Sequence, residues 1–446
     1  MKHRMRNKKP MLYMLVIAWI TTSALSGLLF PACAALGSTV EQHQSLIPEA
    51  LINLSADYAI LVDKKAQRLY AFQRNHTGLE KVFEAPCSTG KNSGPKMISG
   101  DGKTPEGILF ATRIYSVKEL SSTYGSMAFH LNYPNLMDRK EGRNGNNIWI
   151  HGTNKKLRAF QSNGCVTLTN KDILDLSSFI KLDETPIIIK HHIKWVPEDT
   201  LTALKSEVES VLHAWWDAFK KDELQEMKRL YDSEESMDHN NIKALAEKLT
   251  SWKTSGIEVT CNPANISILN HDRYTVVTFD QLIRYRNQSW QCGHRKLFLK
   301  KHDDRWNIAG DKLHSADVDE TFTARLEAID TAIVTWETIE EFIKQWINSW
   351  QSGDMQSYRS YYAPDFKGYG MNLTQWIQYK TGLIGVNKDL CITMENLNVI
   401  PRSTTVTATF TQRYESTGYS DIGVKKLRLK MINNNWKIDR ESWKAF

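Results

Sequence analysis

The second half of the chain contains the same sequence pattern twice. AWWDAFKKDELQEMKRLY (214–231) aligns with QWINSWQSGDMQSYRSYY (345–362) at an offset of 131, which pairs Trp215 with Trp346 and Tyr231 with Tyr362. VVTFDQ (276–281) aligns with TATFTQ (407–412) at the same offset, and KLFLKKHDDRWNI (296–308) aligns with KLRLKMINNNWKI (426–438) at an offset of 130. Matches that keep their order, with one residue gained or lost, indicate a duplication. We therefore predict two related domains, over residues 200–315 and 335–446.

Each copy has the pattern of helices followed by strands. In the first copy, Val208, Leu212, Trp215 and Phe219 recur at spacings of three and four, which is typical of a helix with one buried face. RYTVVTF and KLFLK then alternate as antiparallel strands do, and helices before a curved sheet predict an α+β cone. The aromatic stripe fits core packing, and a pocket for peptide or glycan inside the cone is the alternative. The sequence of neither copy has paired carboxylates or a metal-ligand cluster, so we expect no catalysis there.

The first 34 residues have the pattern of an export signal peptide. MKHRMRNKKP (1–10) holds five Lys or Arg and no acidic residue, residues 11–30 carry no charge, and Ala32-Cys33-Ala34 offers the small residues of a signal-peptidase site. The apolar stretch is also long enough to remain as an uncleaved membrane anchor. In both cases we expect the rest of the chain in the periplasm or cell envelope. The formal net charge of +7 includes these five basic residues, so we expect no nucleic-acid partner.

The cysteine count excludes a scaffold held together by disulfides. Five cysteines follow the leader, an odd number and far too few for that class, so at least one thiol stays free or pairs between chains. They are Cys87, Cys165, Cys261, Cys292 and Cys391. Cys261 with Cys292 is the pair that we consider for a bridge. Cys165 has three open roles: a small buried apolar residue, half of a disulfide, or a nucleophile with His151 as its base.

Residues 55–195 have the pattern of a mostly-β domain. YAILVDKKAQRLYAFQ (58–73) alternates apolar and polar residues around Asp63-Lys64-Lys65, which predicts a β-hairpin. NNIWIHG (146–152) is an apolar strand that runs into His151, and Thr169 or Asn170 is expected to cap a following helix. Many short strands with one helix favour a sandwich or barrel.

Cys165 and His151 have the chemistry of a nucleophile and its base. A thiol with a pKa of about 8.5 is only a few per cent ionised at neutral pH, so it needs a neighbour to take its proton. His151 is the candidate for that neighbour. Gly164 allows a sharp turn directly before the thiol, and its N–H can help to hold an oxyanion. Ser162 and Asn163 stand at the lip of the same turn.

These residues resemble the YkuD family, the L,D-transpeptidase catalytic domain of bacterial cell walls. The family has a His-Gly pair and, after a short loop, Ser/Thr-x-Gly-Cys and an apolar residue; here these are His151-Gly152 and Ser162-Asn163-Gly164-Cys165-Val166. STGKNSGPKMISGDGKTPEGIL (88–109) resembles the family's strand-loop-strand upstream. The repeated domains resemble NTF2-like domains of bacterial envelope proteins in their aromatic opening helix and closing W-x-I strand. The resemblance implies a mostly-β YkuD-like catalytic domain plus two α+β NTF2-like cone domains.

The resemblance also implies a reaction on peptidoglycan stem peptides. Cys165 would attack the amide between the third residue, a diamino acid, and the terminal D-alanine, while His151 takes the thiol proton and passes it to the leaving amine. The Gly152 carbonyl would orient the imidazole, and the N–H groups of Gly164 and Cys165 would hold the oxyanion. An amine would then resolve the thioester into a cross-link, or water would trim the peptide. No metal or organic cofactor is implied.

Two departures from the family pattern keep alternatives open. Many members have His where Asn163 stands, and many cross-linking members have Arg where Thr167 stands; a threonine cannot hold a substrate carboxylate with two prongs. Family members with NTF2-like domains include L,D-carboxypeptidases, so trimming of tetrapeptide to tripeptide is the alternative to transfer. Release of a wall-attached protein and a non-catalytic wall-binding scaffold are the remaining alternatives.

Five residues are expected to contact substrate: Ser162, Asn163, Thr167, His130 and Tyr133. For His130, a structural role in which its ring is hydrogen-bonded is equally compatible with the sequence. The acyl acceptor, the role of the repeated domains and the oligomeric state are left open by the sequence.

Overall fold

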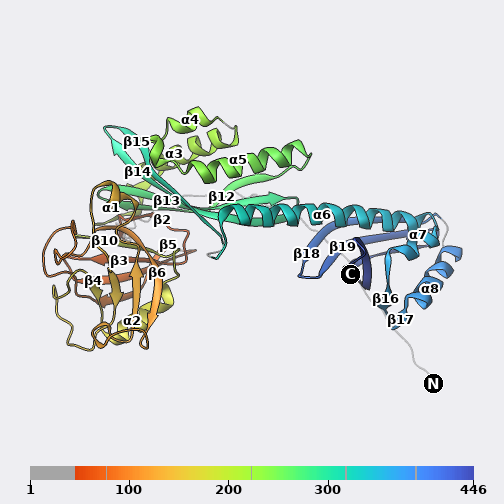
Figure 1. Ribbon diagram of the computed structural model, residues 1–446, viewed down its shortest axis with the longest axis horizontal. Helices are drawn as coiled ribbons and strands as arrows, with labels where there is room; N and C mark the ends of the chain where they lie inside the picture. Colours follow the sequence, from red (N-terminus) through yellow and green to blue (C-terminus); the bar gives the residue numbers. More distant parts are fainter. Residues whose placement is uncertain (1–45, 77, 222, 317–318, 387–388) are drawn as a thin grey trace, which may run out of the picture. The chain divides into compact units, whose positions relative to one another are not determined.

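The computed structural model describes residues 46–446 apart from 77, 222, 317–318 and 387–388 (Figure 1). The predicted export signal, residues 1–34, lies outside the described residues. No helix in the described part of the chain is long and apolar enough to cross a membrane.

The predicted catalytic segment is built on one eight-stranded sheet with the order β5-β4-β3-β10-β6-β7-β8-β9. Its strands are β3 (Ala59–Asp63), β4 (Arg68–Asn75), β5 (Gly78–Pro86), β6 (Gly107–Ser116), β7 (Met127–Leu131), β8 (Trp149–His151), β9 (Val166–Thr167) and β10 (Pro186–Lys190), with helices α1 (Leu136–Lys140) and α2 (Asn170–Leu176). The predicted hairpin is β3-β4. Thr169 caps α2 by accepting a hydrogen bond from the Asp172 N–H. The prediction of a mostly-β domain is confirmed.

The face of each strand follows from the alternation of its side chains. Phe129, Ile150 and Val166 of β7, β8 and β9 are buried together in one core cluster. Their neighbours in sequence therefore point to the other face of the sheet. His151 and Thr167 are two of those neighbours, so the buried residues of β8 and β9 fix where the polar ones point.

The first repeated unit (the first copy, 202–315) has three helices followed by a meander of long strands. These elements are α3 (Thr202–Lys220), α4 (Leu224–Lys228), α5 (His239–Thr254), β12 (Thr260–His271), β13 (Tyr274–Tyr285), β14 (Gln288–His302) and β15 (Arg305–Ser315). Val208, Leu212, Trp215 and Phe219 are all buried on α3, as their spacing predicts.

The second repeated unit (the second copy, 333–445) has the same order of three helices and four long strands, with the short strands β16 and β17 added between its second and third helix. They are α6 (Phe322–Gln351), α7 (Met355–Ser360), β16 (Tyr362–Gly368), β17 (Met371–Asn372), α8 (Leu373–Val386), β18 (Cys391–Pro401), β19 (Thr405–Ser416), β20 (Tyr419–Ile432) and β21 (Asn435–Ala445). In both copies the four long strands pair in sequence order as an antiparallel sheet.

The duplication extends to irregular details of the backbone. β12 has a bulge between Ala264 and Ser267 that contains Asn265 with φ 52°, and β18 has its bulge at the matching place, with Asn396 at φ 55°. The change of offset from 131 to 130 also has a structural place. Cys292 in β14 stands between the residues that pair with Leu282 and Gln281, so it is the extra residue of a bulge, whereas β19 and β20 pair without interruption.

A buried polar network occurs in both copies. In the first copy, Trp215 Nε1 donates to Tyr231 Oη at 2.8 Å, and Tyr231 Oη donates to Asp311 at 2.7 Å. Arg295, with no exposed side-chain surface, pairs with the same carboxylate at 2.6 Å. The second copy repeats this arrangement with Trp346, Tyr362, Glu441 and Lys425. The residues matched in sequence at 215/346 and 231/362 therefore belong to one buried network that both copies contain.

Two boundaries differ from the predicted ones. α6 has 30 residues against 19 in α3, and it begins at Phe322, well before the predicted start of the second domain at 335. β2 (Leu51–Asn53), which precedes the predicted catalytic segment, pairs with β12 at the edge of the first copy's sheet. A sequence pattern locates an element but does not say which neighbour it packs against, so the early start of α6 and the pairing of β2 with β12 did not follow from the pattern.

The cysteines that the structure describes are free thiols, with Cys87, Cys261 and Cys292 buried and Cys391 exposed. Cys261 and Cys292 are therefore not bridged in this structure.

Candidate active site

The pairing of β8 with β9 brings the predicted nucleophile and base together. The two strands are parallel, with Ile150 opposite Val166 and His151 opposite Thr167. Cys165 is the residue directly before β9, two positions before Thr167. The backbone of Thr167 is also held from its other side, by paired hydrogen bonds with Ser88. The strand register thus sets the positions of His151 and Thr167, and Cys165 directly precedes the paired residues.

His151 has a defined tautomer because its Nδ1 meets a carbonyl. Nδ1 lies 2.6 Å from the Gly152 carbonyl oxygen, which can only accept, so Nδ1 carries the proton and Nε2 holds the free lone pair. Burial lowers the pKa of His151 and so favours the neutral ring, while the Gly152 hydrogen bond acts in the opposite direction. Thr167 Oγ1 lies 3.3 Å from Nε2 and is placed to donate to it.

The Cys165 thiol points elsewhere in this structure. Its Sγ lies 3.6 Å from the Asn147 carbonyl oxygen, and no hydrogen bond joins it to His151 among the described residues. Burial raises the pKa of Cys165, while a backbone hydrogen bond with Trp149 and the charge of Lys96 act in the opposite direction. The resting pair is therefore a neutral thiol beside a neutral imidazole, and the thiol must turn to reach Nε2.

Gly164 is required by its surroundings, but its N–H has a different partner from the predicted one. Its φ is 136°, and a Cβ there would lie 2.9 Å from the Lys103 carbonyl oxygen, so a larger residue would be strained. The Gly164 N–H donates to Ser162 Oγ at 3.1 Å, and Ser162 Oγ donates to the Cys165 carbonyl at 2.6 Å. In this conformation the Gly164 N–H is hydrogen-bonded to Ser162, and its predicted oxyanion role stays a prediction. The Ser162 hydroxyl therefore links the backbone of the turn at residues 162–165 instead of facing open solvent.

Gly152 is constrained by close packing against α2. A Cβ on Gly152 would lie 2.5 Å from Asn170 Oδ1 and 3.0 Å from Ile173 Cγ2. The absence of a side chain lets α2 approach β8, and this approach holds the carbonyl that orients His151. Asn170 Oδ1 accepts from the Ser126 N–H at 3.0 Å, so the same side chain ties α2 to β7.

Tyr133 does not line a groove, which corrects the prediction that it contacts substrate. Its ring is 4 % exposed and belongs to the core beneath the site. Its hydroxyl lies 3.3 Å from the carbonyl oxygens of Lys96 and Asn144, so it supports the loop that carries Lys96. Burial raises its pKa. Its ring belongs to the same core cluster as Leu131 and Ile148.

His130 and Asn163 are accessible from solvent. His130 pairs with Trp149 across β7 and β8, and its Nδ1 lies 3.0 Å from Thr112 Oγ1. Burial of the ring lowers its pKa, and the charge of Arg113 adds to this. Asn163 is exposed at the tip of the nucleophile turn. Both residues are placed where a substrate could reach them.

An aromatic wall beside His151 was missed by the sequence analysis. Tyr124 packs edge-on against the His151 ring at 5.0 Å and also contacts Trp149 at 4.7 Å. Tyr115 stacks on Trp149 at 4.9 Å. The sequence could have predicted that Trp149 lies beside His151, because the two are alternate residues of one strand in IWIHG and alternate strand residues share a face.

A buried cation near the thiol was also missed. Lys96 is 3 % exposed and pairs with Asp101 at 2.8 Å, and its charge acts to lower the pKa of Cys165. Burial by itself would raise the pKa of Asp101, but hydrogen bonds from Lys96 and from three backbone N–H groups lower it to about 2. The GPKMISGDGKT loop (94–104) is therefore ordered around this ion pair at the edge of the site.

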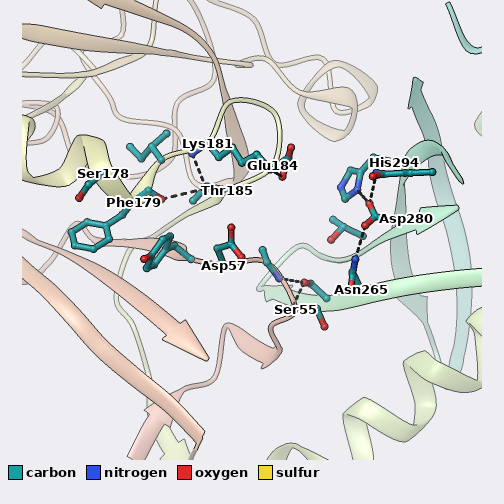
Figure 2. A pocket seen from close by; sticks show the side chains of 16 residues that line it. Ser55, Asp57, Ser178, Phe179, Lys181, Glu184, Thr185, Asn265, Asp280 and His294 are labelled. Carbon is teal, nitrogen blue, oxygen red and sulfur yellow. Dashed lines mark hydrogen bonds and ion pairs between the residues drawn. The ribbon is translucent and has the colours of Figure 1, made fainter. Parts of the chain in front are cut away.

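A separate polar cavity of about 510 Å³ lies beside Asp57 and Asp280 (Figure 2). Figure 2 shows Asp280 between Asn265 and His294, and both donate to its carboxylate at 2.8 Å. None of the residues predicted for the catalytic site lines this cavity. Its central carboxylate, that of Asp280, is already hydrogen-bonded by its neighbours. In the described part of the chain, no group of three or more His, Cys, Asp or Glu side chains is arranged to hold a metal ion.

Comparison with known proteins matches two parts of the chain to described domains. Residues 57–189 match the YkuD L,D-transpeptidase catalytic domain. The chain contains that domain. Residues 338–442 match the Cds6 C-terminal NTF2-like domain, which covers the second copy.

The similarity to individual proteins is partial. YafK of Escherichia coli K12, named a putative L,D-transpeptidase, is 31% identical over 94 residues, which are 21% of this chain and 35% of that protein. The chain thus spans about a third of the length of the curated relatives that it matches. Bd1075 of Bdellovibrio bacteriovorus is 22% identical with a TM-score of 0.31, over 90% of this chain and 99% of that one. The helical cell shape determining protein Pgp2 of Campylobacter jejuni is 16% identical with a TM-score of 0.29, over 90% of this chain and 94% of that one.

Proposed function

We propose that this protein is a peptidoglycan-modifying cysteine enzyme, an L,D-transpeptidase that acts on stem peptides through a thioester on Cys165. The observation that carries the proposal is the hydrogen bond of 2.6 Å between His151 Nδ1 and the Gly152 carbonyl, inside a YkuD domain. It leaves Nε2 as the acceptor that a nucleophilic thiol needs. The parallel pairing of β8 and β9, which sets His151 opposite Thr167 two residues after Cys165, supports the proposal.

In the first step, Cys165 turns from the Asn147 carbonyl toward His151, and its sulfur attacks the carbonyl carbon before the terminal D-alanine. The thiol proton passes to Nε2 as the S–C bond forms, because a neutral thiol beside a neutral imidazole transfers its proton during the attack. The C–N bond then breaks while Nε2 returns that proton to the leaving amine. The products are free D-alanine and a thioester on Cys165.

The charge that develops on the carbonyl oxygen needs donors. The Gly164 N–H is held by Ser162 at rest, so the Cys165 N–H is the donor that we assign, with the Lys96 charge supporting it at longer range. Tyr124 and Trp149 screen the imidazole from water on one side. His130 and Asn163 are assigned to substrate contacts because they are accessible at the rim.

Hydrolysis of the same thioester, which would make the protein an L,D-carboxypeptidase, is the second candidate. The observation that favours it is Thr167, whose hydroxyl lies 3.3 Å from His151 Nε2 in the place where cross-linking relatives have arginine. A hydroxyl there can orient a water molecule beside the base, but it cannot hold the carboxylate of an acceptor peptide with two prongs. We therefore propose that the residue at position 167 decides whether an amine or water accepts the acyl group.

The remaining assignments follow from the same proposal. We infer that the first copy is an NTF2-like domain as well, because its strand order, bulge and buried network repeat those of the second copy, which matches that domain. An enzyme of this kind meets its substrate in the cell envelope, and the export pattern of residues 1–34 agrees with that location. The experiment must also distinguish this enzyme from a non-catalytic scaffold that only binds the cell wall.

The test is mass spectrometry of disaccharide-tetrapeptide incubated with the full chain, with Cys165→Ala as the blank. Peptide dimers joined between two diamino acids establish transfer, whereas loss of D-alanine without dimers establishes trimming. Thr167→Arg is the matched probe of the choice, and we expect it to raise the ratio of dimer to tripeptide. A thiol-reactive carbapenem separates catalysis from a scaffold role: an adduct on Cys165 that is lost in His151→Ala supports an activated thiol, and no adduct in the wild type supports the scaffold.

A further inference from the structure

The first copy contacts the YkuD domain through the turn between β12 and β13, which consists of Asp272 and Arg273. Arg273 Nη2 lies 3.0 Å from Asp138 Oδ1, and its Nη1 donates to Glu141 Oε2 at 2.5 Å. Asp138 is part of α1, and Glu141 directly follows that helix. Lys300 of β14 pairs with the other oxygen of Glu141 at 3.0 Å. Two cations of the first copy thus hold acids at the end of α1.

Tyr274, the residue after this turn, is buried against the same part of the YkuD domain. Its hydroxyl accepts from the Ile108 N–H at 3.0 Å and from Asn135 Nδ2 at 2.8 Å. Asn135 caps α1 by accepting from the Asp138 N–H at 2.9 Å. A Cβ on Gly107 would lie 2.7 Å from Tyr274 Oη, so glycine makes room for the tyrosine. The turn is therefore closely fitted to both β6 and α1.

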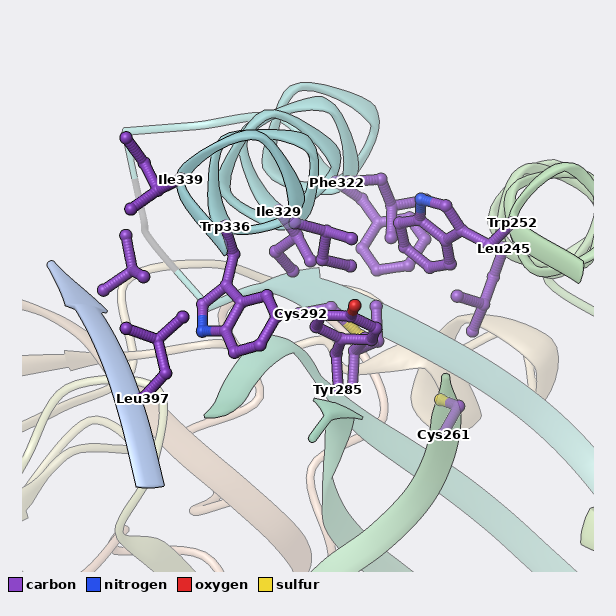
Figure 3. Packing of buried hydrophobic residues seen from close by; sticks show 14 of the residues in the cluster. Leu245, Trp252, Cys261, Tyr285, Cys292, Phe322, Ile329, Trp336, Ile339 and Leu397 are labelled. Atoms are coloured by element: carbon purple, nitrogen blue, oxygen red, sulfur yellow. The ribbon is translucent and has the colours of Figure 1, made fainter. Parts of the chain in front are cut away.

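β13, which starts at Tyr274, is also fixed at its other end. Tyr285 packs edge-on against Trp336 of α6, with the ring centroids 5.4 Å apart. Figure 3 shows Trp336 extending from the first half of α6, residues 322–336, toward Tyr285. The strand that follows Arg273 is therefore packed at both ends, which suits it to be a fixed support.

From Glu141 the contacts continue to the surroundings of Cys165. Arg143 Nε donates to Glu141 Oε2 at 3.0 Å, and Arg143 Nη1 donates to the Lys96 carbonyl at 3.3 Å. Lys96 is the buried cation whose charge acts to lower the pKa of Cys165. Its side chain packs on Gly145, where a Cβ would lie 2.7 Å from Lys96 Cε. The network thus reaches the cation that stabilises a thiolate at this site.

The segment 141–147 also carries the group that the thiol now faces. The Asn147 carbonyl oxygen lies 3.6 Å from Cys165 Sγ. The Asn144 N–H donates to the Met97 carbonyl at 2.9 Å, which joins this segment to the loop that carries the buried cation. The carbonyl beside the thiol and the cation beside the thiol therefore belong to one hydrogen-bonded assembly.

The second copy has different residues at its matching turn. At the offset of 131, Arg273 and Tyr274 correspond to Thr404 and Thr405. Thr404 is exposed. The buried network and the bulge occur in both copies, so the fold of a copy does not need an arginine and a tyrosine at this turn. Their presence in the first copy is explained by their contacts with the YkuD domain.

We propose that Arg273 of the first copy is a positioning residue for the reaction at Cys165. It acts through Glu141 and Arg143, which hold Lys96 beside the thiol. The inference rests on the proposed function, in which Cys165 is the nucleophile, and it gives the first copy a task in that reaction. Without Arg273 the cation is held less firmly, so the thiolate forms less readily while the substrate contacts stay the same.

The first test is the rate at which iodoacetamide alkylates Cys165 in the full chain. Mass spectrometry of the peptide that contains Cys165 excludes the other thiols from the measurement. The thiolate is the reacting form, so we expect Lys96→Met to slow alkylation about tenfold. Arg273→Gln should slow it about threefold, because Lys300 still holds Glu141. Arg273→Lys keeps the charge without the two-pronged geometry and should recover part of the loss. Equal rates in the wild type and Arg273→Gln would overturn the proposal.

Asp272→Asn is the matched control from the same turn. Asp272 pairs with Lys190 of β10 at 2.8 Å, not with α1, and Lys190 also pairs with Glu49 at 2.7 Å. We expect this variant to be alkylated at the wild-type rate. A loss as large as that of Arg273→Gln would mean that any contact between the two domains supports the thiol, which would also overturn the proposal.

A double-mutant cycle tests the route through Lys96. If Arg273 acts through Lys96, then Arg273→Gln has no further effect on alkylation in a Lys96→Met protein. A further slowing equal to that in the wild type would contradict this route. Glu141→Gln breaks the same link from the side of the YkuD domain and has the same expected effects, so it decides the matter if Arg273→Gln misfolds.

Turnover of disaccharide-tetrapeptide separates this inference from the proposed function. We expect Arg273→Gln to lower kcat about threefold and to leave KM unchanged, because Arg273 acts on the thiol and not on substrate binding. A rise in KM alone would overturn the proposal. A wild-type chain that is alkylated at Cys165 but does not convert this substrate would remove the proposed reaction, and the alkylation rates would still decide whether Arg273 positions the thiol's surroundings.

Discussion

The two copies share a buried network but differ in the balance of charge around it. In the first copy one arginine, Arg295, faces one carboxylate, Asp311, and the surface above is covered by the first half of α6. In the second copy two lysines lie near one carboxylate, Glu441, and the surface above is open. The extra cation, Lys380, stands where the first copy has Leu249.

The difference indicates which residues hold the fold and which are free to change. The Trp-Tyr-carboxylate-cation network, the bulge at Asn265 and Asn396 and, apart from the extra residue Cys292, the strand register are the same in both copies, so they belong to the architecture. The residues on the outer side of α5 and α8 differ, because one set packs against the chain itself and the other faces a cavity. Substitutions in matched pairs can test this division.

The largest effect is expected from removing the buried carboxylates. Breaking a buried ion pair from one side costs about 3–5 kcal/mol of unfolding free energy, because the other charge is left unpaired. Asp311→Ala leaves one arginine, whereas Glu441→Ala leaves Lys425 and Lys380 facing each other, so the second substitution should cost more. Denaturant unfolding monitored by hydrogen exchange in each copy measures both. Equal losses would show that Lys380 does not share the charge environment of Glu441.

A gain of stability is expected from Lys380→Met. Replacing a buried, unpaired ammonium group by an apolar side chain of similar length should stabilise the second copy by on the order of 2 kcal/mol at neutral pH. Leu249→Met in the first copy is the matched control, and it should change stability by less than about 1.5 kcal/mol. A loss of stability in Lys380→Met would mean that the lysine has a partner in the folded protein.

The same lysine predicts a pH dependence. Its pKa is lowered to about 7 in the folded protein, against about 10.4 in an unfolded chain. Between these values the unfolded state binds the proton and the folded state does not, so stability rises with pH. The advantage of Lys380→Met should therefore be complete below about pH 7 and disappear toward about pH 10, as read from unfolding curves of both proteins across this range. A constant difference would contradict the lowered pKa.

A smaller effect is expected where α6 meets the first copy. Asp330→Asn removes the charge that Trp252 and Lys248 contact, and it should loosen the first half of α6 by about 1–2 kcal/mol. Glu327→Gln, which removes an exposed ion pair with Lys248, is the control and should cost at most about 0.5 kcal/mol. Hydrogen exchange of peptides from residues 322–336 reports the local opening. Equal exchange in the two variants would mean that apolar contacts alone hold the first half of α6 against the first copy.

The smallest effects are expected at the shared bulge. Asn265 and Asn396 both have a positive φ, which glycine adopts without strain. Asn265 also donates to Asp280 at 2.8 Å, so Asn265→Gly should lose about 0.5–1 kcal/mol. Asn396→Gly should change stability by less than about 0.5 kcal/mol. Thermal unfolding of the two variants makes the comparison, and a reversed order would show that the bulges are not equivalent.

The sequence predicted the features that depend on local pattern. The repeat at offsets of 131 and 130 predicted two units with the same elements, and the structure places the changed offset at Cys292 in β14. Alternation predicted the β3-β4 hairpin, and Thr169 was among the expected caps of α2. His151 and Cys165 were selected by their residue types and spacing, and the sheet register sets His151 opposite Thr167, two residues after Cys165. Their catalytic roles remain predictions that the proposed experiments test.

The tertiary structure decided every feature that depends on which segments meet. Tyr133 is buried because its ring packs in the core beneath the site. The Gly164 N–H is hydrogen-bonded because the Ser162 hydroxyl lies within reach of it. Lys96 reaches the site through a loop far from Cys165 in sequence, and α6 continues past the boundary of its own domain to cover the first copy. A periodic pattern records which face of an element is apolar, because burial acts on each residue by its type. It does not record which partner that face finds, because many apolar surfaces satisfy the same pattern and only the folded chain selects one of them.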